Sequence, residues 1–180
     1  MSIFDDFIKE TGVPCEIVKK YSGILPEELI DVWQKYGFGS IINGYLKIIN
    51  PEEYTDILKN SYFRADVAVP IFVTGFGDIV TWEENEYVCI IRYRRGTFDI
   101  ILKKFKFFFG NMVDEEFLKM YFDIQKYNEA VTKYGNIKFD ECFGYVPLLG
   151  LGGSEKVDNL KVVKTREHIE LITQLVGRIE

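Results

Sequence analysis

Apolar residues in the first third of the chain recur at helical intervals. The clearest stripe begins at Pro26, which suits the first turn of a helix, and stops at Gly37. Its apolar members recur at helical spacing: Leu29 and Ile30, then Trp33, then Tyr36. Shorter helices are expected at 3–10, where Ser2 would cap the first turn, at 16–21 and at 50–59. Glycine-rich 37–44 predicts a loop, and 45–49 predicts a short strand.

The middle of the chain changes to short apolar runs separated by polar turns. Runs of four to eight residues alternate with turns rich in Gly, Asp, Glu, Asn and Arg. This spacing is typical of an antiparallel meander, in which each strand pairs with the next one along the chain. The expected strands are Val67–Thr74, Ile79–Trp82, Tyr87–Tyr93 and Thr97–Leu102.

Helical patterns return after the meander, at 104–110, 114–121 and 123–134. From Cys142 we expect an aromatic-glycine turn, an apolar strand, a Gly-Gly loop, a Leu/Val strand and a helix over Thr165–Val176. The order of elements predicts an α+β fold, with an antiparallel meander in the middle of the chain packed by N-terminal and C-terminal helices. We expect one compact unit of residues 1–180, with a loose boundary that would separate lobes 1–110 and 111–180.

The charge balance limits the classes of partner. The 180 residues include 22 basic and 28 acidic side chains, for a net charge of −6. This acid excess disfavours non-specific nucleic-acid binding, which needs positive charge facing phosphate. It suits a basic partner protein, because complementary fields speed encounter.

Neither the cysteines nor the N-terminus indicates secretion or a membrane. Cys15, Cys89 and Cys142 form no C-x-x-C pair, so we expect reduced and mostly buried thiols. The first ten residues are acidic where a signal peptide is basic, and no run approaches the roughly 20 apolar residues of a membrane span. A cytoplasmic protein is therefore predicted.

The sequence contains no recognisable set of catalytic residues. His168 is the single histidine, no G-x-S-x-G elbow is present, and one histidine cannot form a multi-histidine metal site. The glycines of Gly150–Gly153 and Gly75–Asp78 are read as tight turns, with Asp78 bonding the backbone. We therefore predict a non-enzyme with no metal and no cofactor.

Two charged segments of the meander are candidate interaction surfaces. Glu83, Glu84 and Glu86 lie in a hairpin turn beside Trp82, which is either an ordinary solvated turn or an acidic tip for a basic partner. The segment 92–106 carries six basic residues and one acid, which is either a charged sheet edge or an RNA-binding patch.

Four sequence blocks, in order, resemble a bacterial family called GAD-like or GAD-related proteins. The blocks are Leu25–Ser40, Asn50–Tyr54, Pro70–Ile91 and Cys142–Leu175, the last being the most specific. The resemblance implies a cytoplasmic immunity protein that occludes the active site of a cognate toxin, without catalysis of its own. In the family's best known examples the toxin is a secreted DNase, so the partner we expect is a basic nuclease. The alternative is a tRNA- or RNA-linked accessory domain that uses the 92–106 patch.

Overall fold

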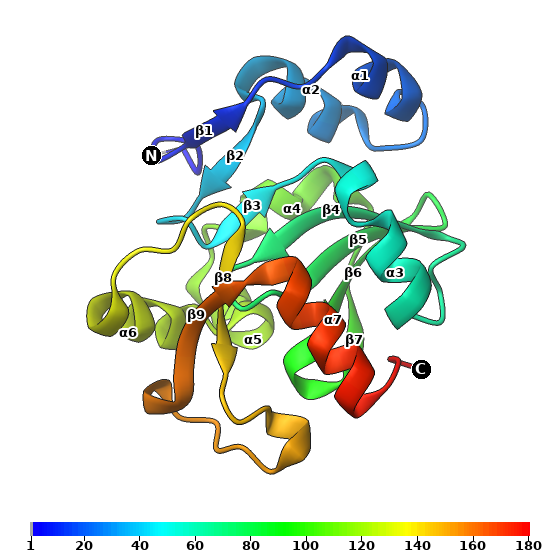
Figure 1. Cartoon of the computed structure of the whole chain (residues 1–180). Coiled ribbons are helices and arrows are strands. Elements are labelled where there is room, and N and C mark those ends of the chain that lie inside the picture. Colours follow the sequence, from blue (N-terminus) through cyan, green and yellow to red (C-terminus); the bar gives the residue numbers. More distant parts are fainter. Residues whose placement is uncertain (1) are drawn as a thin grey trace.

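A seven-stranded antiparallel sheet runs through the centre of the molecule (Figure 1). The computed structural model describes residues 2–180. The order of the strands in the sheet is their order in the chain, which confirms the predicted meander and extends it toward the N-terminus. The strands are β1 (Ile8–Thr11), β2 (Phe38–Ile41), β3 (Leu46–Ile48), β4 (Ala68–Thr74), β5 (Ile79–Glu83), β6 (Tyr87–Arg92) and β7 (Thr97–Lys103).

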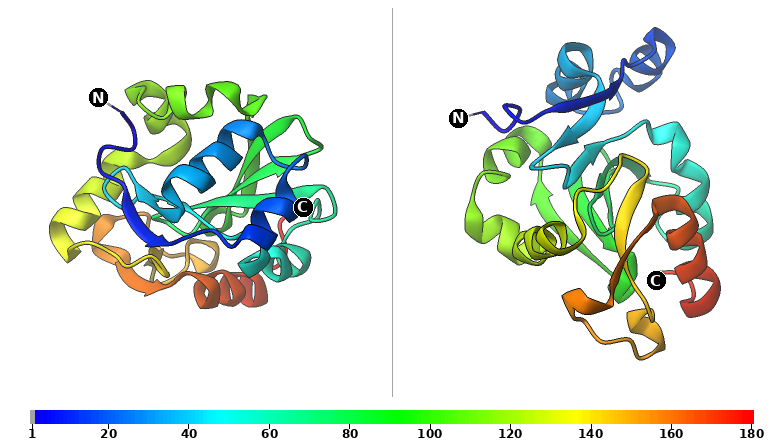
Figure 2. Two further views of the ribbon diagram at one scale, coloured as in Figure 1. Left: turned by 90° about the horizontal axis from the view of Figure 1, so that it is seen from above. Right: turned by 60° about the vertical axis from the view of Figure 1, so that its left-hand side comes forward.

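Helices flank this sheet, so the predicted α+β class is confirmed (Figure 2). Three of them lie between its strands in the chain, and the other four follow it. A separate hairpin of β8 (Glu141–Tyr145) and β9 (Leu160–Lys164) leads into the last helix. The helices are α1 (Cys15–Tyr21), α2 (Glu27–Tyr36), α3 (Thr55–Ser61), α4 (Phe108–Asn111), α5 (Glu115–Phe122), α6 (Ile124–Tyr134) and α7 (Thr165–Val176). The predicted bounds of the last helix agree with α7 at both ends.

The sheet has a separate apolar core on each face. Successive side chains of a strand point to opposite faces, so Phe72 joins one core and Val73 the other. Phe72 stacks on Phe108 of α4, with ring centroids 5.0 Å apart. Val73 shares its core with residues of α3 and α7, including Ile57 and Ile169. In the Phe-rich run that follows β7, Phe105 and Phe108 are buried, whereas Phe107 is exposed.

The expected helix at 3–10 is wrong, because this segment forms a turn and then β1. β1 pairs antiparallel with β2, from Ile8 opposite Ser40. The carboxylate of Asp6 accepts hydrogen bonds from the backbone N–H groups of Ile42 and Asn43, at 3.2 and 2.6 Å. Contacts with residues more than thirty positions away therefore override the local helix pattern.

The expected loop over 37–44 is wrong for Phe38–Ile41, which form the buried strand β2, whereas residues 42–44 form a turn. Its glycines permit close packing rather than flexibility. A Cβ on Gly39 would lie 2.3 Å from the carbonyl oxygen of Ile8 on β1. Glycine inside a strand commonly marks such a close backbone approach.

Two further segments differ from prediction. The aromatic-glycine segment after Cys142 is a strand, β8, rather than a turn, and the apolar run that follows it forms a 3-10 turn at Leu149–Leu151. Pro147 supplies no N–H for strand pairing, so the chain leaves the hairpin there. The helix expected at 50–59 is divided into a 3-10 turn at Pro51–Glu53 and α3.

Candidate functional site: a buried charge cluster

The predicted acidic tip is only partly at the surface. Trp82 is buried, and its indole N–H donates to the carbonyl oxygen of Ile24 at 3.2 Å. Glu83 is fully buried, contrary to the expectation of a solvated acid. Its carboxylate accepts hydrogen bonds from three side chains: the Tyr62 hydroxyl at 3.0 Å, Arg64 Nε at 2.7 Å and the Thr81 hydroxyl at 2.8 Å.

Glu84 and Glu86 are the two predicted tip residues whose side chains reach solvent. Glu84 Oε1 lies 2.6 Å from Arg64 Nη2, and Glu86 Oε1 lies 3.0 Å from Lys103 Nζ. Lys103 lowers the pKa of the Glu86 carboxyl by hydrogen bonding to its charged form. The turn thus exposes two ion-paired carboxylates, those of Glu84 and Glu86. Trp82 and Glu83 are buried, and their hydrogen bonds hold the turn in place.

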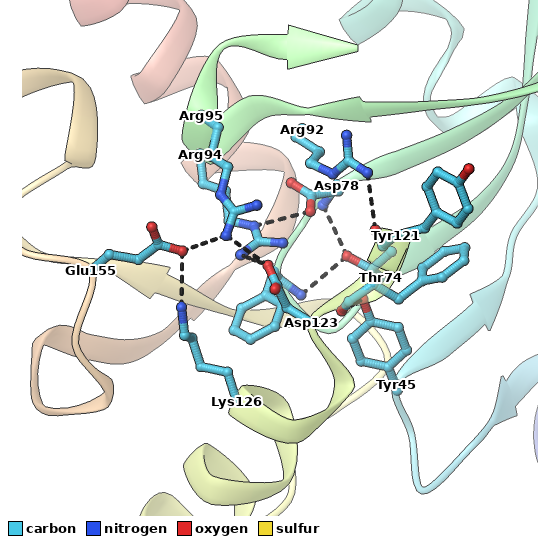
Figure 3. Close-up of polar contacts among 12 residues, drawn as sticks. Tyr45, Thr74, Asp78, Arg92, Arg94, Arg95, Tyr121, Asp123, Lys126 and Glu155 are labelled. Carbon is cyan, nitrogen blue, oxygen red and sulfur yellow. Dashed lines mark hydrogen bonds and ion pairs between the residues drawn. The ribbon is translucent and has the colours of Figure 1, made fainter. Parts of the chain in front are cut away.

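The predicted basic patch is largely neutralised within the molecule. Arg92 pairs with Asp99 and also donates to the backbone carbonyl of Tyr121. Lys103 pairs with Glu86, as described above. Arg94 and Arg95 belong to a larger cluster that spans the molecule's two sequence halves (Figure 3). Four of the six basic residues of 92–106 are therefore engaged by carboxylates.

Arg94 is the centre of this buried charge cluster. Its Nε donates to Asp78 Oδ2 at 3.0 Å, and both side chains are almost completely removed from solvent. Its guanidinium carbon lies 4.4 Å from the centroid of the Phe76 ring, in a cation–π arrangement. Burial raises the pKa of Asp78, and the charge of Arg94 opposes that shift. The expected role of Asp78 as a backbone-bonding turn residue is therefore wrong.

A second layer of charges surrounds Arg94. Asp123 Oδ2 lies 2.9 Å from Arg94 Nη1 and 2.8 Å from Arg95 Nη2. Arg95 also forms an ion pair with Glu155. A second ion pair joins Glu155 Oε1 to Lys126 Nζ at 2.9 Å. Burial would raise the pKa of Glu155, but the hydrogen bonds from Arg95 and Lys126 outweigh burial and lower it to about 2.

A small cavity adjoins the cluster. Its polar lining includes Arg94, Tyr145 and His168, and its apolar walls include Leu148 and Ile172. Burial lowers the pKa of His168. The imidazole packs against Gly144, where an added Cβ would lie 2.4 Å from Nε2. The single histidine is thus a buried residue of the contact between α7 and β8.

The sequence did not reveal this cluster because its members are distant from one another in the chain. Asp78, Arg94, Asp123 and Glu155 come from four different connections between elements. The one local signal is the pair Arg94-Arg95, which follows the apolar strand β6 by one residue.

Family models match the two halves of the chain separately. Residues 1–93 match the model described as the GAD-like domain, which is just over half of the chain. This chain belongs to the GAD-like domain family. Residues 102–176 of this GAD-like chain match the model of the C-terminal part of the T6SS immunity protein Tdi1. Arg94 and Arg95 lie in the short segment between the two matches.

A solved structure shares the whole fold. The crystal structure of Atu4351 from Agrobacterium tumefaciens matches with a TM-score of 0.74 and 16% sequence identity, over 96% of this chain and 87% of that one. No curated protein matches the chain in sequence. None of the helices in residues 2–180 is long and apolar enough to cross a membrane. Within the same residues, no three His, Cys, Asp or Glu side chains are grouped to hold a metal ion.

Proposed function

We propose that this chain is an immunity protein that binds a cognate toxin of a type VI secretion system and occludes the toxin's active site. The observation that carries the proposal is the pair of matches in chain order. One is to the GAD-like domain, and the other is to the C-terminal part of an immunity protein of that system. The two matched segments are packed against a common core, in which Tyr45 of the first lies 4.9 Å from Tyr127 of the second, between ring centroids.

The proposed role is binding without catalysis. His168, the residue most suited to general base chemistry, is buried against Gly144, and burial favours its neutral form. The buried charge cluster consists of paired Arg, Asp, Glu and Lys side chains, and such pairing compensates the cost of burying the charges without implying catalysis.

We further propose that the toxin is a basic nuclease and that the two proteins meet in the cytoplasm. The net charge of −6 supports this choice, because a nuclease must hold a polyanion and is therefore attracted to an acidic surface. The acidic tip remains our proposed contact. Its outer residues Glu84 and Glu86 would touch the toxin, with Trp82 and Glu83 fixing the turn that presents them.

The RNA-binding alternative loses its main support in this geometry. It needs the basic residues of 92–106 to face solvent, whereas Arg92, Arg94 and Arg95 pair internally with carboxylates. RNA retention by these arginines would require breaking those pairs.

The proposal is tested by expressing the protein together with the product of the gene beside its own. We expect the neighbour to kill its host when expressed alone and to be harmless when this chain is present. Degraded host DNA or RNA in the unprotected cells would identify the toxin as a nuclease. A harmless neighbour, or killing despite this chain, would contradict the immunity function.

The acidic tip is tested in the same assay with charge-reversed variants. Replacing Glu84 and Glu86 by Lys should weaken toxin binding and protection. The matched control is Asp31→Lys with Glu129→Lys, which changes the net charge equally at exposed positions on two helices. If both double variants protect like the wild type, the tip does not contact the toxin.

A further inference from the structure

The cavity beside Arg94 is enclosed by elements from both halves of the chain. Arg94 follows β6, Tyr145 ends β8, and His168 lies in the first half of α7. All three side chains are at least nine-tenths buried. Leu148 and Ile172 give the cavity buried apolar walls, and the exposed Val176 lies at its rim. Its walls are therefore fixed by packing rather than by a mobile loop.

The cavity holds more hydrogen-bond donors than the protein itself satisfies. Arg94 Nη1 and Nη2 are buried and donate to no acceptor within residues 2–180. Nη1 lies 2.9 Å from Asp123 Oδ2, but the angle makes no hydrogen bond. The Tyr145 hydroxyl is likewise buried without a partner in the described chain. Leaving such buried groups unpaired destabilises the fold.

The charged side chains that line the cavity itself are all basic. Arg94 and Arg95 both line it, and the lining found within residues 2–180 includes no Asp or Glu. The carboxylates of Asp78 and Asp123 approach Arg94 from outside that lining. The cavity therefore presents positive charge and N–H donors to whatever enters it.

Size and donor count together favour an anion over a single water. The cavity measures about 40 Å³, whereas roughly 10–15 Å³ on this measure already holds one water. A water accepts only two hydrogen bonds and adds two donors of its own to a site that is rich in donors. A carboxylate has about four acceptor positions and matches a guanidinium geometrically.

We infer that this cavity is a binding site for a small, singly charged oxyanion of the size of formate. Arg94 and Tyr145 would donate hydrogen bonds to its oxygens, and the apolar walls would exclude larger carboxylates. The small volume and the burial of Arg94 and Tyr145 indicate a free ion as the source rather than a side chain of a partner protein. Because the ion would contact groups from both halves of the chain, its binding would stabilise the fold, independently of toxin binding.

The experiment is a thermal unfolding series in which sodium formate replaces sodium gluconate at constant total salt. Gluconate carries the same carboxylate but is too large for the cavity. We expect a saturable rise of the melting temperature in the wild type, from which an apparent Kd for formate follows. In the wild-type protein, the NMR signal of the Arg94 Nε–H group should shift with the same Kd.

A variant that lacks the Tyr145 hydroxyl tests whether this donor binds formate. Tyr145→Phe deletes only the hydroxyl and should weaken formate binding by about tenfold, as expected for a hydrogen bond to a charged group. Tyr134→Phe is the control, because the Tyr134 hydroxyl donates to the Val157 carbonyl outside the cavity; its Kd should equal that of the wild type. No saturable response in the wild type, or equal responses in both variants, would overturn the inference.

Discussion

Two buried charges at opposite ends of β6 differ in how completely they are paired. Glu83, before the β5–β6 turn, accepts hydrogen bonds from Tyr62, Arg64 and Thr81. Arg94, after β6, donates one hydrogen bond to Asp78 and leaves both terminal nitrogens without an acceptor in residues 2–180. A buried network in which every polar group has a hydrogen-bond partner stabilises the fold by itself. A network with unsatisfied donors can gain those hydrogen bonds from a ligand.

The two networks also differ in what they connect. The partners of Glu83 all lie within residues 62–84, inside the segment that matches the GAD-like domain. The Arg94 cluster reaches Asp123 and, through Arg95, Glu155, both in the segment that matches the immunity protein. The first network is thus local, and the second joins the two halves.

We propose, from this second connection, that lobes 1–110 and 111–180 unfold as one unit. Trp33 and Trp82 report on the first lobe by fluorescence, and His168 reports on the second by NMR. In urea, both signals should change at the same midpoint, because the core and the Arg94 cluster span both lobes. Two separate midpoints would show that the lobes are independent.

The next largest effect is expected at Glu83. Glu83→Ala leaves three buried or partly buried groups without their acceptor and should lower the free energy of unfolding by about 3–5 kcal/mol. Its neighbour Glu84 forms an exposed ion pair, so Glu84→Ala should cost less than about 1 kcal/mol. Urea titrations of both variants measure the difference, and similar losses would show that burial of Glu83 does not matter.

A double-mutant cycle isolates the Arg94–Asp78 pair. Each single change, Asp78→Asn or Arg94→Met, should destabilise by about 2–3 kcal/mol, because it leaves the partner buried without its counter-charge. The double variant should lose less than the sum of the two, by more than about 1 kcal/mol. Additive losses in urea titrations would mean that Asp78 and Arg94 do not depend on each other.

The smallest of these effects is a pH dependence from His168. Burial lowers its pKa in the folded state, so the unfolded chain takes up the proton first as the pH falls. Stability should therefore be complete above the unfolded pKa of about 6.5 and decrease as the pH falls below it. His168→Gln should remove that decrease between about pH 7 and 5. An unchanged slope in unfolding experiments would assign it to other groups.

The fold could be predicted from the sequence wherever one local pattern decides the structure. The apolar stripe behind Pro26 gave α2, and the alternating runs from Val67 onward gave the central strands. β1 and β2 could not be predicted in this way, because their pairing depends on Asp6 reaching Ile42 and Asn43 and on the missing side chain of Gly39. These are contacts between separate parts of the chain.

The charged residues illustrate the same limit more strongly. Glu83 and Arg94 occupy polar turns in the sequence, which predicts solvated side chains, yet both are buried. Nothing local distinguishes Glu83 from the exposed Glu84 beside it. The difference arises from the alternation of the strand, which turns Glu83 inward toward Tyr62 and Arg64, and from partners that only the fold brings together.

The central claim, that this chain is the binding partner of a toxin, is tested most directly by measuring that binding. The toxin encoded beside its gene would be purified in a catalytically inactive form and titrated with this chain by calorimetry. We predict a one-to-one complex with a Kd in the nanomolar range or tighter. A folded toxin that forms no complex with this chain at micromolar concentrations would contradict the account.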